Sequence, residues 1–132
     1  MPPPHACHCS NCRKFTGHYE AGTDVPREQV EVAGEVNIKW FQSSYRARRG
    51  FCSICGSSMF FDVPGTDWIG ISMGAFNGPT ETSLLAHIFV ADKGDYYEIA
   101  DGLPQHQHAP DGPLETNPPA ASSAQETIQP AG

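Results

Sequence analysis

The sequence has no long apolar run. No stretch approaches the roughly 18 consecutive apolar residues that a membrane-spanning helix needs, so we expect no association with a membrane. The first residues, Met1-Pro2-Pro3-Pro4, also lack the charged and apolar regions of a secretory signal peptide. We therefore expect a cytoplasmic, reducing location.

Basic residues are few and unevenly distributed. The 132 residues include eight Lys and Arg against 15 Asp and Glu, which gives a net charge of −7. Seven of the eight lie in the first 60 positions, whereas the remaining chain has one base and ten acids. A general nucleic-acid binder would show a basic stripe and a high isoelectric point, so we expect no nucleic-acid partner. The basic residues of the first half still leave room for a local cationic pocket.

The sequence also lacks the sustained 3.6-residue period of long amphipathic helices. Ser10 and Gly17 predict only one short helical turn between them, with Ser10 as its N-cap. Short segments elsewhere alternate apolar and polar residues, which predicts a small antiparallel all-β domain. We expect a domain over residues 1–105 and a tail rich in Pro, Ala and Ser over 106–132, since the tail has little to bury. The expected strands cover 29–33, 36–40, 45–51, 58–63, 68–75, 87–91 and 96–99.

Three cysteines fall within six residues at the start of the chain. A Cys-x-Cys places two sulfurs on one side of a tight loop, and a following Cys-x-x-Cys turns the third back toward them. Three protein ligands leave one position of a tetrahedral ion open, whereas a structural zinc site is usually closed by four. The sequence therefore predicts a reactive Zn²⁺ site at Cys7, Cys9 and Cys12.

Other uses of these thiols are less well supported. A disulfide framework is disfavoured because the chain has five cysteines, an odd number, and no secretory signal. An iron–sulfur cluster would need four thiolates in typical spacings, and this run supplies three. Unligated redox thiols remain open as an alternative.

A second thiol pair, Cys52-Ser53-Ile54-Cys55, is followed by Gly56 and has the pattern of a zinc knuckle. A thioredoxin-like redox pair is the rival interpretation, but that motif precedes a helix, and here a Gly-Ser-Ser and an aromatic strand follow. Two thiolates cannot close a tetrahedral site. Spacing alone would join Cys52 and Cys55 to Cys9 and Cys12, and would leave Cys7 spare.

Four strings, in this order along residues 5–105, resemble the glutathione-dependent formaldehyde-activating enzyme family, which shares its domain with centromere protein V. The two cysteine strings together are quite specific, whereas the two later strings are weak alone. The strings are Cys7-His8-Cys9-Ser10-x-Cys12-Arg13, Arg49-Gly50-Phe51-Cys52-x-x-Cys55-Gly56-Ser57, His87-Ile88-Phe89-Val90 and Asp101-Gly102-Leu103-Pro104.

The resemblance implies an all-β, Mss4-like fold with small antiparallel sheets. It also implies a three-cysteine zinc site at Cys7, Cys9 and Cys12, and a four-cysteine structural site whose second half matches Cys52 and Cys55. The family's first Cys-x-Cys, which lies upstream of the three-cysteine run, is absent, so we expect a domain truncated at its N-terminus. Because missing strands would leave an unpaired sheet edge, we expect a homodimer.

The resemblance further implies glutathione, or a similar small thiol, as partner in a carbon–sulfur lyase reaction of the formaldehyde–glutathione condensation type. Zinc in the open site would lower the pKa of an incoming thiol. His87 is a candidate proton carrier, with a structural role as the alternative. A non-catalytic zinc-binding interaction module, or an inactive truncated member, is the alternative function. Cationic side chains that would either meet the carboxylates of glutathione or form a solvated strand face are Arg13, Lys14, Arg46, Arg48 and Arg49.

Overall fold

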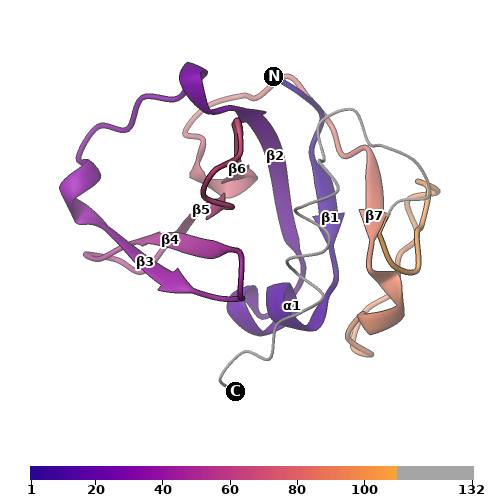
Figure 1. Ribbon diagram of the computed structural model, residues 1–132. Coiled ribbons are helices and arrows are strands. Elements are labelled where there is room, and N and C mark those ends of the chain that lie inside the picture. The colour runs from indigo at the N-terminus through magenta and orange to yellow at the C-terminus, as the bar shows by residue number, and fades with distance from the viewer. Residues whose placement is uncertain (110–132) are drawn as a thin grey trace.

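The computed structural model describes residues 1–109, which form one seven-stranded sheet and a single short α-helix (Figure 1). The strand order is β3-β4-β5-β6-β2-β1-β7. Most of the predicted tail, residues 110–132, lies outside the described residues. The strands are β1 (His5–Cys7), β2 (Glu20–Pro26), β3 (Ile38–Gln42), β4 (Arg48–Cys52), β5 (Ser58–Asp62), β6 (Trp68–Ser72) and β7 (Ala86–Ile88), and the helix is α1 (Ser10–Thr16).

The predicted all-β class is confirmed, but the sheet is mixed. β1 pairs antiparallel with β2 and parallel with β7, and every other pair is antiparallel. A parallel pair needs a long connection, and nearly the whole described chain separates β1 from β7. The expectation of purely antiparallel sheets is therefore wrong at this one pair.

Of the two strands predicted at residues 29–33 and 36–40, the first does not form. Only β3 forms, and it pairs with β4 from Ile38 opposite Cys52 to Gln42 opposite Arg48. Residues before β3 instead contain two 3₁₀ turns, Arg27–Gln29 and Glu35–Asn37. β4 is the better partner because Gly50 lets the Trp40 ring lie flat against its backbone: a Cβ at Gly50 would come within 2.9 Å of that ring. The strand predicted at 96–99 is also absent from the described structure.

The helical turn predicted after Ser10 is present, with a different cap. Cys9 is the N-cap residue, and its Sγ accepts a hydrogen bond from the Cys12 N–H at 3.3 Å. Gly17 ends the helix in the left-handed region at φ 83°, and its N–H donates to the Arg13 carbonyl. A cysteine thus takes the position predicted for Ser10, so that the cap of α1 and the thiol cluster are built together.

The cysteines themselves form part of the core. Cys7, Cys9 and Cys12 pack with Ile88 and Phe89 at the junction of β1, α1 and β7. A second cluster of Ala47, Val63 and Trp68 lies elsewhere in the sheet. No helix within residues 1–109 is long and apolar enough to cross a membrane.

Backbone pairing along β7 continues beyond the domain end that we predict at residue 105. His87 donates to the Pro104 carbonyl and accepts from the His106 N–H, each at 2.9 Å. Phe89 donates to the His108 carbonyl, also at 2.9 Å. The segment 104–108 is thus attached to the sheet, while the division of the chain at 105 stays a prediction.

Candidate metal centre

The structure brings the three predicted cysteines of the first run together. Cys7 ends β1, Cys9 caps α1 and Cys12 lies in its first turn. Their sulfur atoms all lie within 4.8 Å of one another, and the residues are 2%, 3% and 0% exposed. Among residues 1–109 this is the one group of three or more side chains close enough to share a metal ion.

Arg49 contacts this cluster from β4. Its Nη2 donates to the Cys12 Sγ at 3.3 Å, and the residue is 2% exposed. The guanidinium also lies over the rings of Phe15 and Phe61, at 5.2 and 5.3 Å from their centroids. A buried guanidinium needs a negative partner, and here the nearest one is a cysteine sulfur.

The three thiols differ in their acidity. Hydrogen bonds from Cys7 and Cys9, together with the charge of Arg49, hold the pKa of Cys12 well below its usual range, although burial acts in the opposite direction. Burial raises the pKa of Cys7, and the hydrogen bond to Cys12 raises that of Cys9 to about 12. Without a metal, the negative charge is therefore concentrated on Cys12.

This donor set fits a soft divalent cation. Three sulfur atoms at mutual ligand distance, one of them with a lowered pKa, are the ligands that Zn²⁺ and other thiophilic ions prefer. Binding would displace the remaining thiol protons, so that affinity would depend on pH. Because the cluster is also part of the core, the metal would stabilise the fold as well as serve a site.

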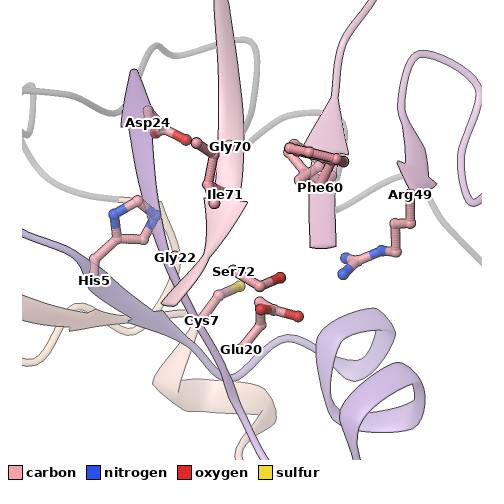
Figure 2. A pocket seen from close by; sticks show the side chains of 11 residues that line it. His5, Cys7, Glu20, Gly22, Asp24, Arg49, Phe60, Gly70, Ile71 and Ser72 are labelled. Carbon is pink, nitrogen blue, oxygen red and sulfur yellow. The ribbon is translucent and has the colours of Figure 1, made fainter. Parts of the chain in front are cut away.

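A small cavity of about 40 Å³ borders Cys7 (Figure 2). Figure 2 shows the side chains of Glu20 and Arg49 pointing toward the space beside Cys7 from opposite sides. Glu20 faces this cavity because it is the direct β2 partner of Cys7, so both side chains lie on one face of the sheet. The wall consists of His5, Cys7, Glu20, Gly22, Asp24, Arg49, Phe60, Phe61, Gly70, Ile71 and Ser72.

Two acids of β2, the half-buried Glu20 and the buried Asp24, line this cavity, and our sequence analysis missed both. Burial raises the pKa of the Glu20 carboxyl, which accepts a hydrogen bond from Ser58 Oγ at 3.4 Å. Burial also raises the pKa of Asp24, to about 7, and its Oδ2 has no hydrogen-bond partner in the described structure. The signal in the sequence was the period of two over Glu20, Gly22 and Asp24, which places acids and a glycine on one strand face.

The cationic residues proposed to contact a substrate do not form one pocket. Arg49 lies at the cluster, whereas Arg48 points to the other face of β4, where its Nε donates to Asp62 at 2.8 Å. Arg48 also lies 3.9 Å from the ring centroid of Trp40. Lys14 is exposed on α1, and Arg13 is half-buried. A contact between these residues and glutathione stays a prediction.

The second cysteine pair forms the predicted tight turn. The Gly56 N–H donates to the Cys52 carbonyl at 2.7 Å, and Gly56 has φ 81°. Cys52 is half-buried, Cys55 is exposed, and Cys55 Sγ lies 3.1 Å from Ser57 Oγ. In the part of the chain that the structure describes, no third ligand joins this pair, and the alternative grouping with Cys9 and Cys12 is not formed. Metal binding by Cys52 and Cys55 stays a prediction.

Fold and site together define a small β protein whose core holds a three-cysteine cluster able to bind a metal ion. The chain belongs to the glutathione-dependent formaldehyde-activating enzyme family, whose sequence model matches residues 2–92. It is also 27% identical over 101 residues to a Schizosaccharomyces pombe protein named as an uncharacterized lyase. That alignment covers 76% of this chain and 73% of the yeast protein.

Proposed function

We propose that this protein is a zinc-dependent carbon–sulfur lyase-type enzyme that acts on glutathione adducts of small aldehydes, of the formaldehyde–glutathione condensation type. The observation that carries the proposal is a cluster of three cysteine sulfurs, one of which, that of Cys7, borders a small cavity lined by both polar and apolar side chains. The family description and the name of the yeast relative support a lyase-type function related to glutathione. We also propose a cytoplasmic location, where thiols stay reduced.

Cys7, Cys9 and Cys12 would hold the zinc ion, and Arg49 would keep Cys12 ionised for it. When bound, the ion would supply a Lewis-acid centre with one free position that favours the thiolate form of an incoming thiol. The protein's own contribution would be to hold the three sulfur atoms in a buried cluster, with Cys7 at the edge of the cavity.

The cavity limits the size of the carbonyl compound. A water molecule needs about 10–15 Å³ of such volume, so about 40 Å³ admits a one-carbon aldehyde and excludes a large one. Glu20 and the hydroxyl of Ser72 line the cavity and are positioned to hydrogen-bond the oxygen of the adduct. Condensation forms the carbon–sulfur bond, the thiol loses its proton, and the carbonyl oxygen gains one, so no proton is consumed overall.

A larger open groove would hold the rest of the thiol substrate. It measures about 480 Å³ and runs between the end of α1 and the Cys52–Cys55 turn, with Phe15, Phe51 and Gly56 among its walls. Ser58 lines the groove and hydrogen-bonds Ser72 Oγ, a wall of the inner cavity, at 3.1 Å. The two walls therefore contact each other, and a tripeptide that reacts at its central side chain would lie across them.

One observation favours the alternative, a non-catalytic zinc module. The three cysteines are at most 3% exposed, which is typical of a structural metal site. The two functions differ in the fourth coordination position, which is open in the enzyme and closed in the module.

Cobalt substitution separates these functions. We expect glutathione at millimolar concentration to intensify the sulfur-to-cobalt charge-transfer absorption of the Co²⁺ protein, and formaldehyde exchange with the adduct to accelerate in an NMR assay. Cys9→Ser should abolish both responses, and Cys55→Ser, outside the cluster, should retain them. An absorption spectrum that does not change when glutathione is added would favour the non-catalytic zinc module.

A further inference from the structure

A buried chain of hydrogen bonds lies on the other side of β1 from the cysteines. His8 stands between Cys7 and Cys9, and because side chains alternate along extended backbone, it points away from their sulfur atoms. Its Nε2 lies 2.8 Å from His87 Nδ1, and its Nδ1 bonds the hydroxyl of Tyr97. His87 Nε2 in turn lies 2.8 Å from Asp101 Oδ2.

The two imidazole rings have almost no contact with solvent. His8 is 0% exposed and His87 is 3% exposed, whereas the Asp101 side chain is 41% exposed. The ring of His8 also stacks on Tyr97 and tilts against Tyr19. Ring nitrogens buried to this degree each need a hydrogen-bond partner, and the neighbouring side chains supply one for each of them.

The Asp101 carboxylate fixes one end of this series of hydrogen bonds. It can only accept, and its other oxygen already accepts from the Leu103 N–H at 3.0 Å. His87 Nε2 therefore donates to Asp101, and His87 Nδ1 shares a hydrogen bond with His8 Nε2. The remaining nitrogen of His8 bonds the Tyr97 hydroxyl. Every ring nitrogen has a partner, so the orientation of both rings is fixed.

The hydrogen bonds from His8 to Asp101 join the metal-ligand segment to two distant parts of the protein. His87 belongs to β7, and Asp101 begins the segment whose backbone pairs with β7 at Pro104 and His106. The backbone N–H of His8 donates to the Ile88 carbonyl at 3.0 Å, so side chain and main chain hold the same residue. The peptide units on either side of His8 carry Cys7 and Cys9.

We propose that His87 and Asp101 are positioning residues that hold His8, and through its peptide units the sulfur atoms of Cys7 and Cys9, in the arrangement that the metal requires. The strings around His87 and Asp101 that the sequence analysis singled out thereby acquire a physical role. This inference rests on the proposed metal centre but not on the proposed reaction.

The test measures the dissociation constant for Co²⁺ by competition with a chelator, well below the unfolding temperature of each variant. Outer-shell partners of metal sites typically change affinity by about 10–100-fold, so we expect His87→Leu to weaken binding by at least about tenfold. Asp101→Leu should weaken it less, since the side chain is partly solvated. Asp101→Asn should bind as the wild type does, because its amide oxygen still accepts from His87. His87→Gln, which can donate to Asp101 and accept from His8, should restore part of the loss.

Val63→Ala is the matched control. Val63 is 3% exposed in the second core cluster, so its truncation should lower stability without changing the hydrogen bonds of His8 and His87. We expect its Co²⁺ affinity and charge-transfer spectrum to match the wild type. Equal Co²⁺ affinity of wild type and His87→Leu, or an equal loss in Val63→Ala, would overturn the inference. If His87→Leu does not fold, His87→Gln and Asp101→Leu decide by the same comparison.

Failure of the two proposals gives different results. A wild-type protein that binds no Co²⁺ would overturn the metal centre and this inference together. The other result is a protein that binds Co²⁺ with the expected ranking of variants but whose absorption spectrum does not change when glutathione is added. That result would support this inference and contradict the proposed reaction.

Discussion

The guanidinium of Arg49 donates to the sulfur of Cys12 at 3.3 Å, and both residues are at most 2% exposed. The sequence analysis grouped Arg49 with surface cations that would meet the carboxylates of a substrate. The structure places it against the thiol cluster, where its charge favours the ionised form of Cys12.

Replacing Arg49 should destabilise the metal-free protein. Arg49→Met removes the charge but keeps much of the volume, and breaking a buried ion pair costs about 3–5 kcal/mol. We expect a loss of about 3 kcal/mol in the free energy of unfolding, measured with urea in the presence of chelator and reductant. Arg46→Met, at an exposed position before β4, is the control and should change stability by less than about 0.5 kcal/mol. Equal stability of the two variants would contradict the pairing.

Asp24 should make stability depend on pH. Burial raises its pKa from 3.8 to about 7 in the folded state, so the folded protein keeps a proton that the unfolded chain releases. The free energy of unfolding therefore falls as pH rises from about 4 to about 7, and the whole cost is present above pH 7. Asp24→Asn should be more stable than the wild type at pH 8, by on the order of 2–4 kcal/mol, with a difference that vanishes near pH 4.

Urea unfolding of both proteins at pH 8 and at pH 5 measures this difference. Asp95→Asn, at an exposed position, serves as the control and should show no such trend. A gain for Asp24→Asn that is the same at both pH values would indicate a cause other than the buried charge.

Metal removal should destabilise the protein, and one zinc ion per chain should account for the effect. The cluster is part of the core, so a chelator should lower the melting temperature of the wild type but leave Cys9→Ser unaffected. Native mass spectrometry should find one zinc in the wild type and also in a double variant with Cys52→Ser and Cys55→Ser. Two zinc ions per wild-type chain would show that the second pair binds metal too.

The outer edge of β3 should mediate self-association. Within residues 1–109 no strand pairs with this edge, and Val36, Phe41 and Tyr45 near it are 91%, 42% and 90% exposed. A second copy would satisfy the free backbone groups and cover these side chains. We expect sedimentation equilibrium to show a dimer that Phe41→Lys converts to monomer, whereas Glu98→Lys, far along the chain, should leave it dimeric. A monomeric wild type at high concentration would exclude this interface.

The three-cysteine cluster could be predicted from sequence because its ligands are local. Six residues of chain decide whether Cys7, Cys9 and Cys12 can meet, and a short helix after Cys9 suffices to turn the third sulfur inward. Distant partners could not be predicted in the same way. Arg48 and Arg49 are chemically alike, and only the pleat of β4 decides which of them is buried at the cluster and which faces Asp62.

The same limit explains the errors in the sheet. Alternation at residues 29–33 suggested a strand, yet pairing depends on what lies opposite, and Trp40 packs on Gly50 of β4 instead. The pairing of β1 with β7 joins strands that lie far apart in the sequence, and no local sequence pattern predicts it. The hydrogen-bonded chain from His8 to Asp101 was missed for the same reason, although both residues stood in strings that the sequence analysis had marked.

β1 has only three residues, and its two neighbours reach it from opposite directions along the chain. β2 follows it almost at once, but β7 comes about eighty residues later, and the segment 104–108 that pairs with β7 comes later still. During synthesis, the cysteines at the start of the chain therefore cannot be enclosed until almost the last described residue has left the ribosome. Until then the thiols stay open to cellular metal donors, reductants and oxidants, so any ion that binds this cluster would have to compete with those reactions while the protein is still being made.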